Sequence, residues 1–119
     1  MITSGDFSRV KRLLSADVYT AVFERGQRFN LSVGLYIVLP TEQATARLGL
    51  IVAKKRLAKA VKRNHLKRCQ REAFRLSQAK LKAVDIVFLV NNRLTKLTRR
   101  QMTLWCKKDW LKLSVLLSA

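Results

Sequence analysis

The chain has 119 residues, and 49% of them are hydrophobic, which suffices for one small core and argues against a disordered chain. Its 25 Lys and Arg residues against 7 Asp and Glu give a formal net charge of +18. Such an excess repels itself, so a polyanionic partner, above all the phosphates of a nucleic acid, is expected. No apolar run approaches the ~20 residues of a membrane span, no signal peptide is evident, and Cys69 and Cys106 form no CxxC pair. We therefore expect a single reduced cytoplasmic domain over residues 1–119.

The first element predicted is a helix over residues 18–26, which Ser15 can cap and Gly26 can end. Tyr19 and Phe23 are four residues apart, so their rings share one face of this helix. Two interpretations of the rings are open: burial in the core, or a stacking surface for unpaired bases. Tyr36, in the following strand, could extend such a surface.

Strands are predicted in apolar segments rich in β-branched residues. Leu31–Leu39 and Arg47–Lys54 are separated by a short polar loop, which favours an antiparallel hairpin. Asp85–Val90 is a continuous apolar run typical of a buried strand. A short strand at Val10–Leu14 could add to the sheet.

Two long helices are predicted, from Leu57 to about Ala79 and from Thr98 onward. The first lies between two strands, so a β-α-β unit with parallel strands is expected. Its predicted core stripe is Val61, Cys69, Ala73 and Leu76, with Ala58 and Leu66 beside it. In the second helix one face is formed by Leu97, Leu104, Leu111 and Val115. Trp105 and Trp110 of the same helix are predicted at the core or its edge. The order α-β-β-α-β-α indicates an α+β sandwich with helices packed on a small sheet.

The segment from Lys54 to Arg75 holds ten basic residues and one acid, Glu72. Basic side chains recur every fourth residue, which makes a ridge with steps of about 6 Å, close to the phosphate spacing of a nucleic-acid strand. The alternatives are a merely solvated basic face, or an anionic membrane, which would favour a basic helix with a large apolar face. We predict phosphate binding by the ridge Arg63, Lys67, Arg71 and Arg75, with Asn64 and Arg68 along its edge.

Catalytic patterns are missing from the sequence. The one histidine, His65, has no carboxylate three or four residues beyond it, and the acidic residues are scattered. There are no paired carboxylates, no HExxH, no phosphate-binding glycine loop and no nucleophile elbow. We predict neither a catalytic residue nor a metal ligand in the chain.

Residues 60–75, Ala-Val-Lys-Arg-Asn-His-Leu-Lys-Arg-Cys-Gln-Arg-Glu-Ala-Phe-Arg, resemble the RNR signature of bacterial ribonuclease P protein subunits, A-V-x-R-N-x-x-K-R-x-x-R-E/Q-x-F-R. Residues 47–55 are similar to the family's strand that enters this helix, and Phe7 through Phe23 to its N-terminal strand and first helix. The resemblance implies an α-β-β-β-α-β-α fold, like the second domain of ribosomal protein S5, with a left-handed β-α-β crossover.

The same resemblance implies a subunit that assists a catalytic RNA in removing the 5′ leader of precursor tRNA, with hydrolysis by Mg²⁺ held on the RNA. The implied partners are ribonuclease P RNA and precursor tRNA, in a 1:1 ribonucleoprotein without membrane attachment. Where the family commonly has Arg, this chain has His65, a weaker phosphate partner. By position, Arg63, Asn64, Lys67, Arg68 and Arg71 would contact the catalytic RNA, and Tyr19, Phe23 and Tyr36 would line the leader cleft, with Lys54 and Lys55 close to it. The alternatives are a structural ribosomal or ribosome-assembly RNA-binding protein, and an intrinsic nuclease, which the missing acidic cluster disfavours.

Overall fold

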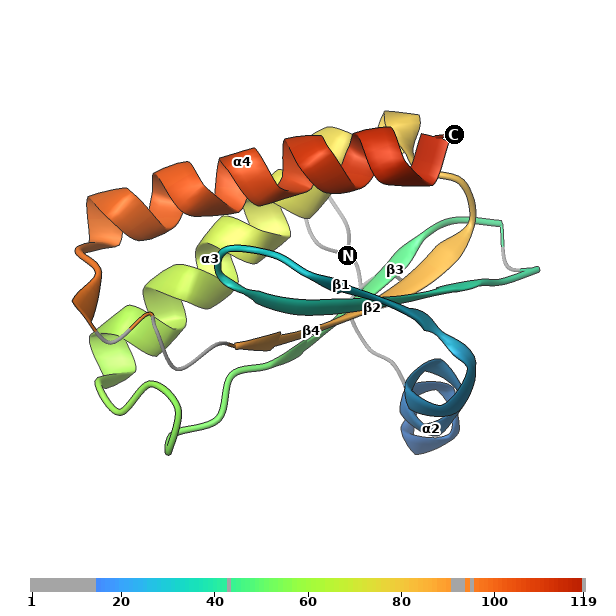
Figure 1. Ribbon diagram of the computed structural model, residues 1–119. Helices are drawn as coiled ribbons and strands as arrows, with labels where there is room; N and C mark the ends of the chain where they lie inside the picture. Colours follow the sequence, from blue (N-terminus) through green and yellow to red (C-terminus); the bar gives the residue numbers. More distant parts are fainter. Residues whose placement is uncertain (1–14, 43, 91–93, 95, 119) are drawn as a thin grey trace, which may run out of the picture.

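The computed structural model describes residues 15–42, 44–90, 94 and 96–118, drawn in colour in Figure 1. The elements follow the order α-β-β-β-α-β-α, so the α+β class and the element order that the resemblance implied are confirmed. The strand considered at Val10–Leu14 lies outside the described residues. The elements are α2 (Ala16–Arg25), β1 (Gln27–Asn30), β2 (Gly34–Pro40), β3 (Arg47–Ile51), α3 (Ala60–Ser77), the 3-10 turn η1 (Gln78–Lys80), β4 (Val84–Val90) and α4 (Arg99–Ser118).

The four strands form one mixed sheet in the order β1-β2-β4-β3. The strand β4 pairs antiparallel with β2 and parallel with β3, which confirms the predicted parallel unit around α3. The predicted hairpin between Leu31–Leu39 and Arg47–Lys54 is wrong, because β4 lies between these two segments. The apolar run of β4 needs a neighbour on each side to satisfy its backbone, so it takes the inner position.

The hairpin that does form joins β2 to β1, a strand not predicted from the sequence. Its sequence, Gln-Arg-Phe-Asn, is polar and mostly exposed, as an edge strand allows. The turn is closed by α4: both oxygens of the Asp109 carboxylate accept hydrogen bonds, from the backbone N–H groups of Ser32 (3.1 Å) and Val33 (2.8 Å). The last helix is thereby fixed to the first strand pair.

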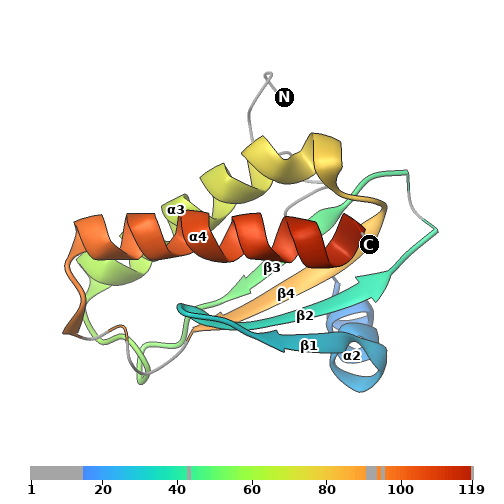
Figure 2. The ribbon, with the colours of Figure 1, turned by 45° about the horizontal axis from the view of Figure 1, so that its top comes forward.

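Helices cover the two faces of the sheet unequally, as Figures 1 and 2 show. The long helices α3 and α4 lie side by side across one face, and the short helix α2 lies on the other. Side chains of each strand alternate between the faces. In β2, Tyr36 and Val38 join the large core under α3 and α4, whereas Ile37 and its neighbours Leu35 and Leu39 meet α2.

The helix α2 spans Ala16–Arg25, two residues longer at its start than predicted, and is capped at its two ends by the predicted residues, Ser15 and Gly26. The backbone N–H of Val18 donates to the Ser15 hydroxyl (3.3 Å), and the N–H of Gly26 donates to the Val22 carbonyl (2.8 Å). A Cβ at Gly26 would lie 2.5 Å from that carbonyl oxygen and 2.6 Å from a methyl of Ile37. Glycine at this position therefore lets the chain leave the helix close against the sheet.

The large core holds four buried rings around one buried amide. The indole N–H of Trp110 donates to Oε1 of Gln70 (2.6 Å), and the Gln70 amide N–H donates to the Tyr36 hydroxyl (2.8 Å). Burial raises the pKa of Tyr36 well above its ordinary value, with a smaller contribution from Cys106 in the same direction. The rings of Phe74 and Phe88 complete the cluster, with centroids 5.8 Å from Trp110 and 4.9 Å from Tyr36, respectively. The buried polar groups are thus satisfied inside an aromatic core.

The predicted apolar stripes of the two long helices are wrong in part. In α3, Ala73 and Leu66 are buried, but Val61 and Leu76 are 61% and 62% exposed. The helix touches both the sheet and α4, so its buried arc is shifted to include Gln70 and Phe74. In α4, Trp110 is buried and Trp105 lies at the edge, but the exposed residues include Leu104, Leu111 and Val115, and the buried ones are Met102, Cys106, Asp109, Trp110, Leu113 and Ser114.

Candidate RNA-binding surface

The outer side of α3 carries the predicted phosphate-binding side chains. Asn64 and Arg68 are exposed, and Lys67 and Arg71 are half-buried along the adjoining side of the helix. The buried residues of α3 pack in the core on the sheet, and the helix also packs against α4. A rigid helix therefore presents these groups in a fixed array, which favours binding to a structured RNA backbone.

Arg63 has a local partner. Its guanidinium donates to the backbone carbonyls of Leu57 (3.0 Å) and Ala58 (2.5 Å), in the connection that enters α3. Leu57 is buried, so Arg63 ties this connection to the helix while the side chain remains half-buried. Arg63 has an evident structural role, whatever it contributes to RNA binding.

Arg75 also has a local partner, the Glu72 carboxylate one turn earlier on α3. The pair is a hydrogen-bonded ion pair, which lowers the pKa of Glu72 and raises that of Arg75. A phosphate would have to compete with this acid for the Arg75 guanidinium. Arg75 is therefore the weakest candidate among the arginines of the ridge.

His65 points away from the ridge, into the seam between α3 and α4. Its Nε2 lies 2.9 Å from the hydroxyl of Thr103 and 2.9 Å from the carbonyl of Arg99, both on α4. His65, which stands where the resemblance leads one to expect an arginine, thus makes a contact between α3 and α4 in this structure.

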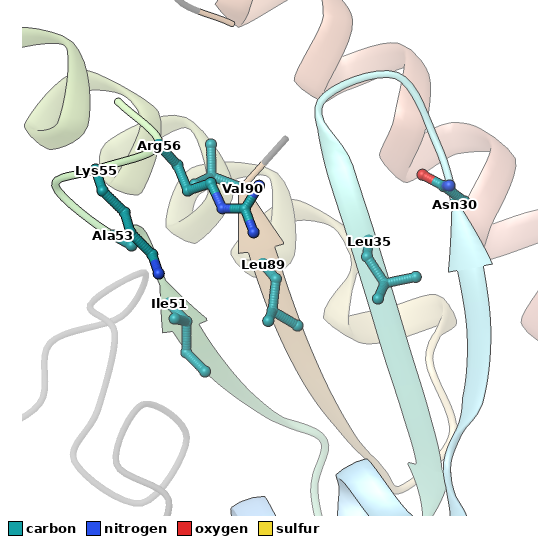
Figure 3. A pocket seen from close by; sticks show the side chains of 8 residues that line it. All are labelled: Asn30, Leu35, Ile51, Ala53, Lys55, Arg56, Leu89 and Val90. Atoms are coloured by element: carbon teal, nitrogen blue, oxygen red, sulfur yellow. The ribbon is translucent and has the colours of Figure 1, made fainter. Parts of the chain in front are cut away.

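A second candidate site is a cleft on the α2 face of the sheet, with a volume of about 430 Å³. Figure 3 shows Leu35, Leu89 and Ile51 pointing from three adjacent strands into the same space. Asn30 lies at one side and the turn after β3 at the other, with Lys55 and Arg56. The cleft thus has an apolar floor and a basic rim.

The basic rim is a turn that the sequence places between β3 and α3. The backbone N–H groups of Arg56 and Leu57 both donate to the Ala53 carbonyl, at 3.0 and 3.1 Å, which closes the turn. Of the two lysines predicted near the leader, Lys55 lines this cleft, and Lys54 is exposed in the same turn without lining it. Arg56 lines the cleft too, although it was not among the predicted leader-binding residues.

Tyr19 and Phe23 lie beside this floor, packed against the same apolar cluster as Leu35, Ile51 and Leu89. The two rings are stacked, with centroids 6.4 Å apart and planes at 29°. Both are half-buried, and partial burial raises the pKa of the Tyr19 hydroxyl. The two interpretations of these rings are therefore compatible, because each packs against the core and leaves part of its surface accessible.

The prediction that Tyr36 extends this aromatic surface is wrong. Its side chain is 0% exposed and lies on the opposite face of the sheet, bonded to Gln70. Its neighbour Leu35 faces the cleft instead. A shift of one residue along a strand reverses the face, and the sequence did not show which face of β2 was which. Strict alternation from a known core residue is the pattern that could have identified Leu35, Leu89 and Ile51.

No cluster of three or more His, Cys, Asp or Glu side chains is placed to hold a metal ion within the described ranges. None of the helices that the structure describes is both long and apolar enough to cross a bilayer.

The chain matches the family model described as Ribonuclease P over residues 7–114. It is 41% identical over 105 residues to the ribonuclease P protein component of Pasteurella multocida, covering 88% of each chain. It is 35% identical over 109 residues to that of Pseudoalteromonas translucida, covering 92% of this chain and 78% of the relative.

Solved structures show the same fold. The RNase P protein of Staphylococcus aureus superposes with a TM-score of 0.77 at 24% identity, over 90% of this chain and 97% of that one. The RNase P protein of Thermotoga maritima gives a TM-score of 0.67 at 26% identity, over 90% and 94%. These matches favour the expected tRNA 5′-processing subunit over the ribosomal alternative. With the signature on α3 and the cleft beside α2, they establish that the chain belongs to the family of ribonuclease P protein components, which are part of an endoribonuclease complex.

Proposed function

We propose that this chain holds the 5′ leader of precursor tRNA in the cleft beside α2 while the outer side of α3 binds ribonuclease P RNA. The observation that carries this proposal is that the cleft and the outer side of α3 are adjacent. The turn of Lys55 and Arg56 forms one edge of the cleft, and the chain continues from this turn into α3. One continuous basic path can therefore contact two RNA segments at the same time.

The cleft suits a single strand better than a duplex. Its floor is apolar and lies next to two stacked rings, and its rim is cationic. Unpaired bases can pack on the floor or stack on Tyr19 and Phe23, while their phosphates meet Lys55 and Arg56. A leader is single-stranded, whereas the paired acceptor stem of a tRNA would bury its bases away from such a floor.

The outer side of α3 suits a folded RNA. Arg68 and Asn64 are exposed on a helix that the core holds rigidly, and Lys67 and Arg71 extend the array. A guanidinium can grip two phosphate oxygens, so an arginine array fixes orientation as well as affinity.

In this proposal the protein binds and orients RNA, and Mg²⁺ held mainly on the RNA supplies the hydrolytic chemistry. In the same proposal one chain joins one ribonuclease P RNA and one precursor tRNA, with the leader in the cleft of Leu35 and the RNA on the outer side of α3.

Reconstitution tests the proposal. The purified chain should stimulate precursor tRNA cleavage by a bacterial ribonuclease P RNA at low Mg²⁺. Lys55→Ala should weaken the binding of leader-bearing substrate, and the matched control Lys80→Ala, an exposed lysine on η1 that does not line the cleft, should not. Absence of stimulation would refute the function, and equal effects of the two variants would refute the role of the cleft.

A further inference from the structure

A cluster of sulfur and polar side chains lies in the seam between α3 and α4, apart from the cleft and next to Arg68 at the edge of the ridge. Cys69 Sγ is 3.4 Å from Nε2 of His65 and 3.4 Å from the Thr103 hydroxyl. Cys106 follows Thr103 by almost one turn of α4, so it lies on the same side of α4 as the residue that Cys69 contacts, and Cys69 packs against the core cluster that contains Cys106. The chain has 2 cysteines, and both lie where α3 packs against α4.

The two thiols differ in access to solvent. Cys69 is half-buried and lines a cavity of about 300 Å³ together with His65, Arg68 and Thr103. Cys106 is only 1% exposed and lies in the core. A small solute in the cavity can therefore reach Cys69, whereas Cys106 does not line the cavity and is shielded from solvent.

The surroundings favour the thiolate at the accessible position. The pKa of Cys69 is lowered to about 6, chiefly by the hydrogen bond from Cys106, and further by Thr103 and the charges of His65 and Arg68, against an opposing effect of burial. The pKa of Cys106 is raised, by its bond to Cys69, by burial and by the charges of Cys69 and Asp109. The charged groups that also line the cavity are Glu72 and Lys107. The pair therefore loses one proton easily, from Cys69, and keeps the other on Cys106.

We propose that Cys69 and Cys106 form an oxidisable dithiol, in which Cys69 reacts with a hydroperoxide from the seam cavity and Cys106 resolves the product to a disulfide that joins α3 to α4. Three observations carry this assignment: the contact of Cys69 with Thr103, one turn before Cys106 on α4; the packing of Cys69 against the core cluster that contains Cys106; and the access to Cys69 from the cavity. The cavity shares Arg68 with the proposed RNA-binding side of α3, but the assignment does not require that Arg68 binds RNA.

The chemistry balances with hydrogen peroxide as the oxidant. The Cys69 thiolate attacks one peroxide oxygen; the S–O bond forms, the O–O bond breaks, and the departing hydroxide takes a proton to become water. This step leaves a sulfenic acid on Cys69. The Cys106 sulfur, on giving up its proton, attacks the Cys69 sulfur and displaces the hydroxyl as a second water. In total two thiols lose two electrons and two protons, and one peroxide is reduced to two waters.

Peroxide treatment of the reduced, folded full-length chain tests the proposal. After the remaining thiols are blocked, mass spectrometry should show a monomer that has lost two hydrogen atoms, with the peptides of Cys69 and Cys106 linked and separable by dithiothreitol. This measurement on the unaltered chain needs no variant to fold.

Two variants assign the order of events. Cys106→Ala should stop at a sulfenic acid on Cys69, trapped by dimedone, and Cys69→Ala should leave Cys106 unreacted. The proposal is overturned if both thiols stay titratable under peroxide that fully oxidises free cysteine, if the linkage forms only between chains, or if Cys106 is the residue that carries the sulfenic acid.

Discussion

The two faces of the sheet are made by the same strands, yet one is closed and the other is open. The face under α3 and α4 is sealed by Tyr36, Phe88, Phe74 and Trp110. The face under α2 is covered by a helix of 10 residues, which leaves a cleft over Leu35 and its neighbours.

The difference lies in how many helical residues cover each face. Two helices of 18 and 20 residues span one side, and the strands there add the buried rings of Tyr36 and Phe88 to their aliphatic side chains. On the other side the strand residues are aliphatic, and α2 reaches only part of them. A short helix thus makes room for a ligand without weakening the core on the opposite face.

The largest effect is expected from the closed face. Trp110→Ala would remove a ring that contacts Tyr36 and Phe74 and would leave Gln70 short of a donor. We expect a loss of about 3–5 kcal/mol in the free energy of unfolding, measured with urea. The control is Trp105→Ala on the same helix, 37% exposed, which should cost less than half as much. Equal losses would show that α4 is not held mainly through the aromatic cluster.

On the open face the same kind of truncation should change binding more than stability. Phe23→Ala should weaken the binding of leader-bearing precursor tRNA by about 1–3 kcal/mol if a base stacks on the ring. The comparison is with leaderless tRNA, whose affinity should stay unchanged. An equal loss for both substrates, or unfolding of the variant, would make Phe23 a core residue only.

The outer side of α3 should respond to salt. Arg68 is exposed, so Arg68→Ala should reduce the slope of log affinity against log salt by about one counterion on titration with ribonuclease P RNA. Arg75→Ala is the matched control, with a smaller change expected because Glu72 already pairs with that guanidinium. A larger change for Arg75 than for Arg68 would contradict the geometry of the ridge.

The smallest expected effect is on the rate of alkylation of Cys69, between α3 and α4. With a pKa lowered to about 6, Cys69 gains thiolate as pH rises through that value and is mostly thiolate at pH 7. Alkylation by iodoacetamide should reach half of its maximal rate near pH 6 and then level off. At pH 7 it should exceed the rate of a free thiol by a few-fold, since a low pKa also lowers intrinsic nucleophilicity. A rate that keeps rising above pH 8 would show that the seam does not activate Cys69.

The parts of the fold that local chemistry determines could be predicted from the sequence. Ser15 and Gly26 bound α2, and the apolar run of β4 indicates a buried strand. The start of α4 follows the same logic, because the Thr98 hydroxyl accepts from the N–H of Gln101 (3.1 Å) while the Gln101 side chain accepts from the N–H of Thr98 (2.9 Å).

Tertiary packing determines the rest. Periodicity on α3 favoured Val61 and Leu76 as core residues, but the arc that meets both the sheet and α4 runs through Gln70 and Phe74. Gln70 is buried because two rings supply its hydrogen-bond partners, which no local pattern reveals. The basic residues could be predicted as candidates because a positive charge is evident from the residue type alone. The apolar floor of the cleft could not be predicted, because the sequence does not show which side chains of the three strands lie on the same face of the sheet.

The hydrogen bonds between Asp109 and the turn that joins β1 to β2 have a consequence for the order in which the chain folds. The carboxylate reaches back 77 and 76 residues to hold Ser32 and Val33, so the turn that begins the sheet stays incomplete until the last helix has been synthesised. The central strand β4 likewise arrives after both of its neighbours in the sequence. Closing such long loops is slow compared with forming a local hairpin. A nascent chain therefore exposes its basic helix and its unfinished sheet together, and RNA can meet the protein while it is still folding.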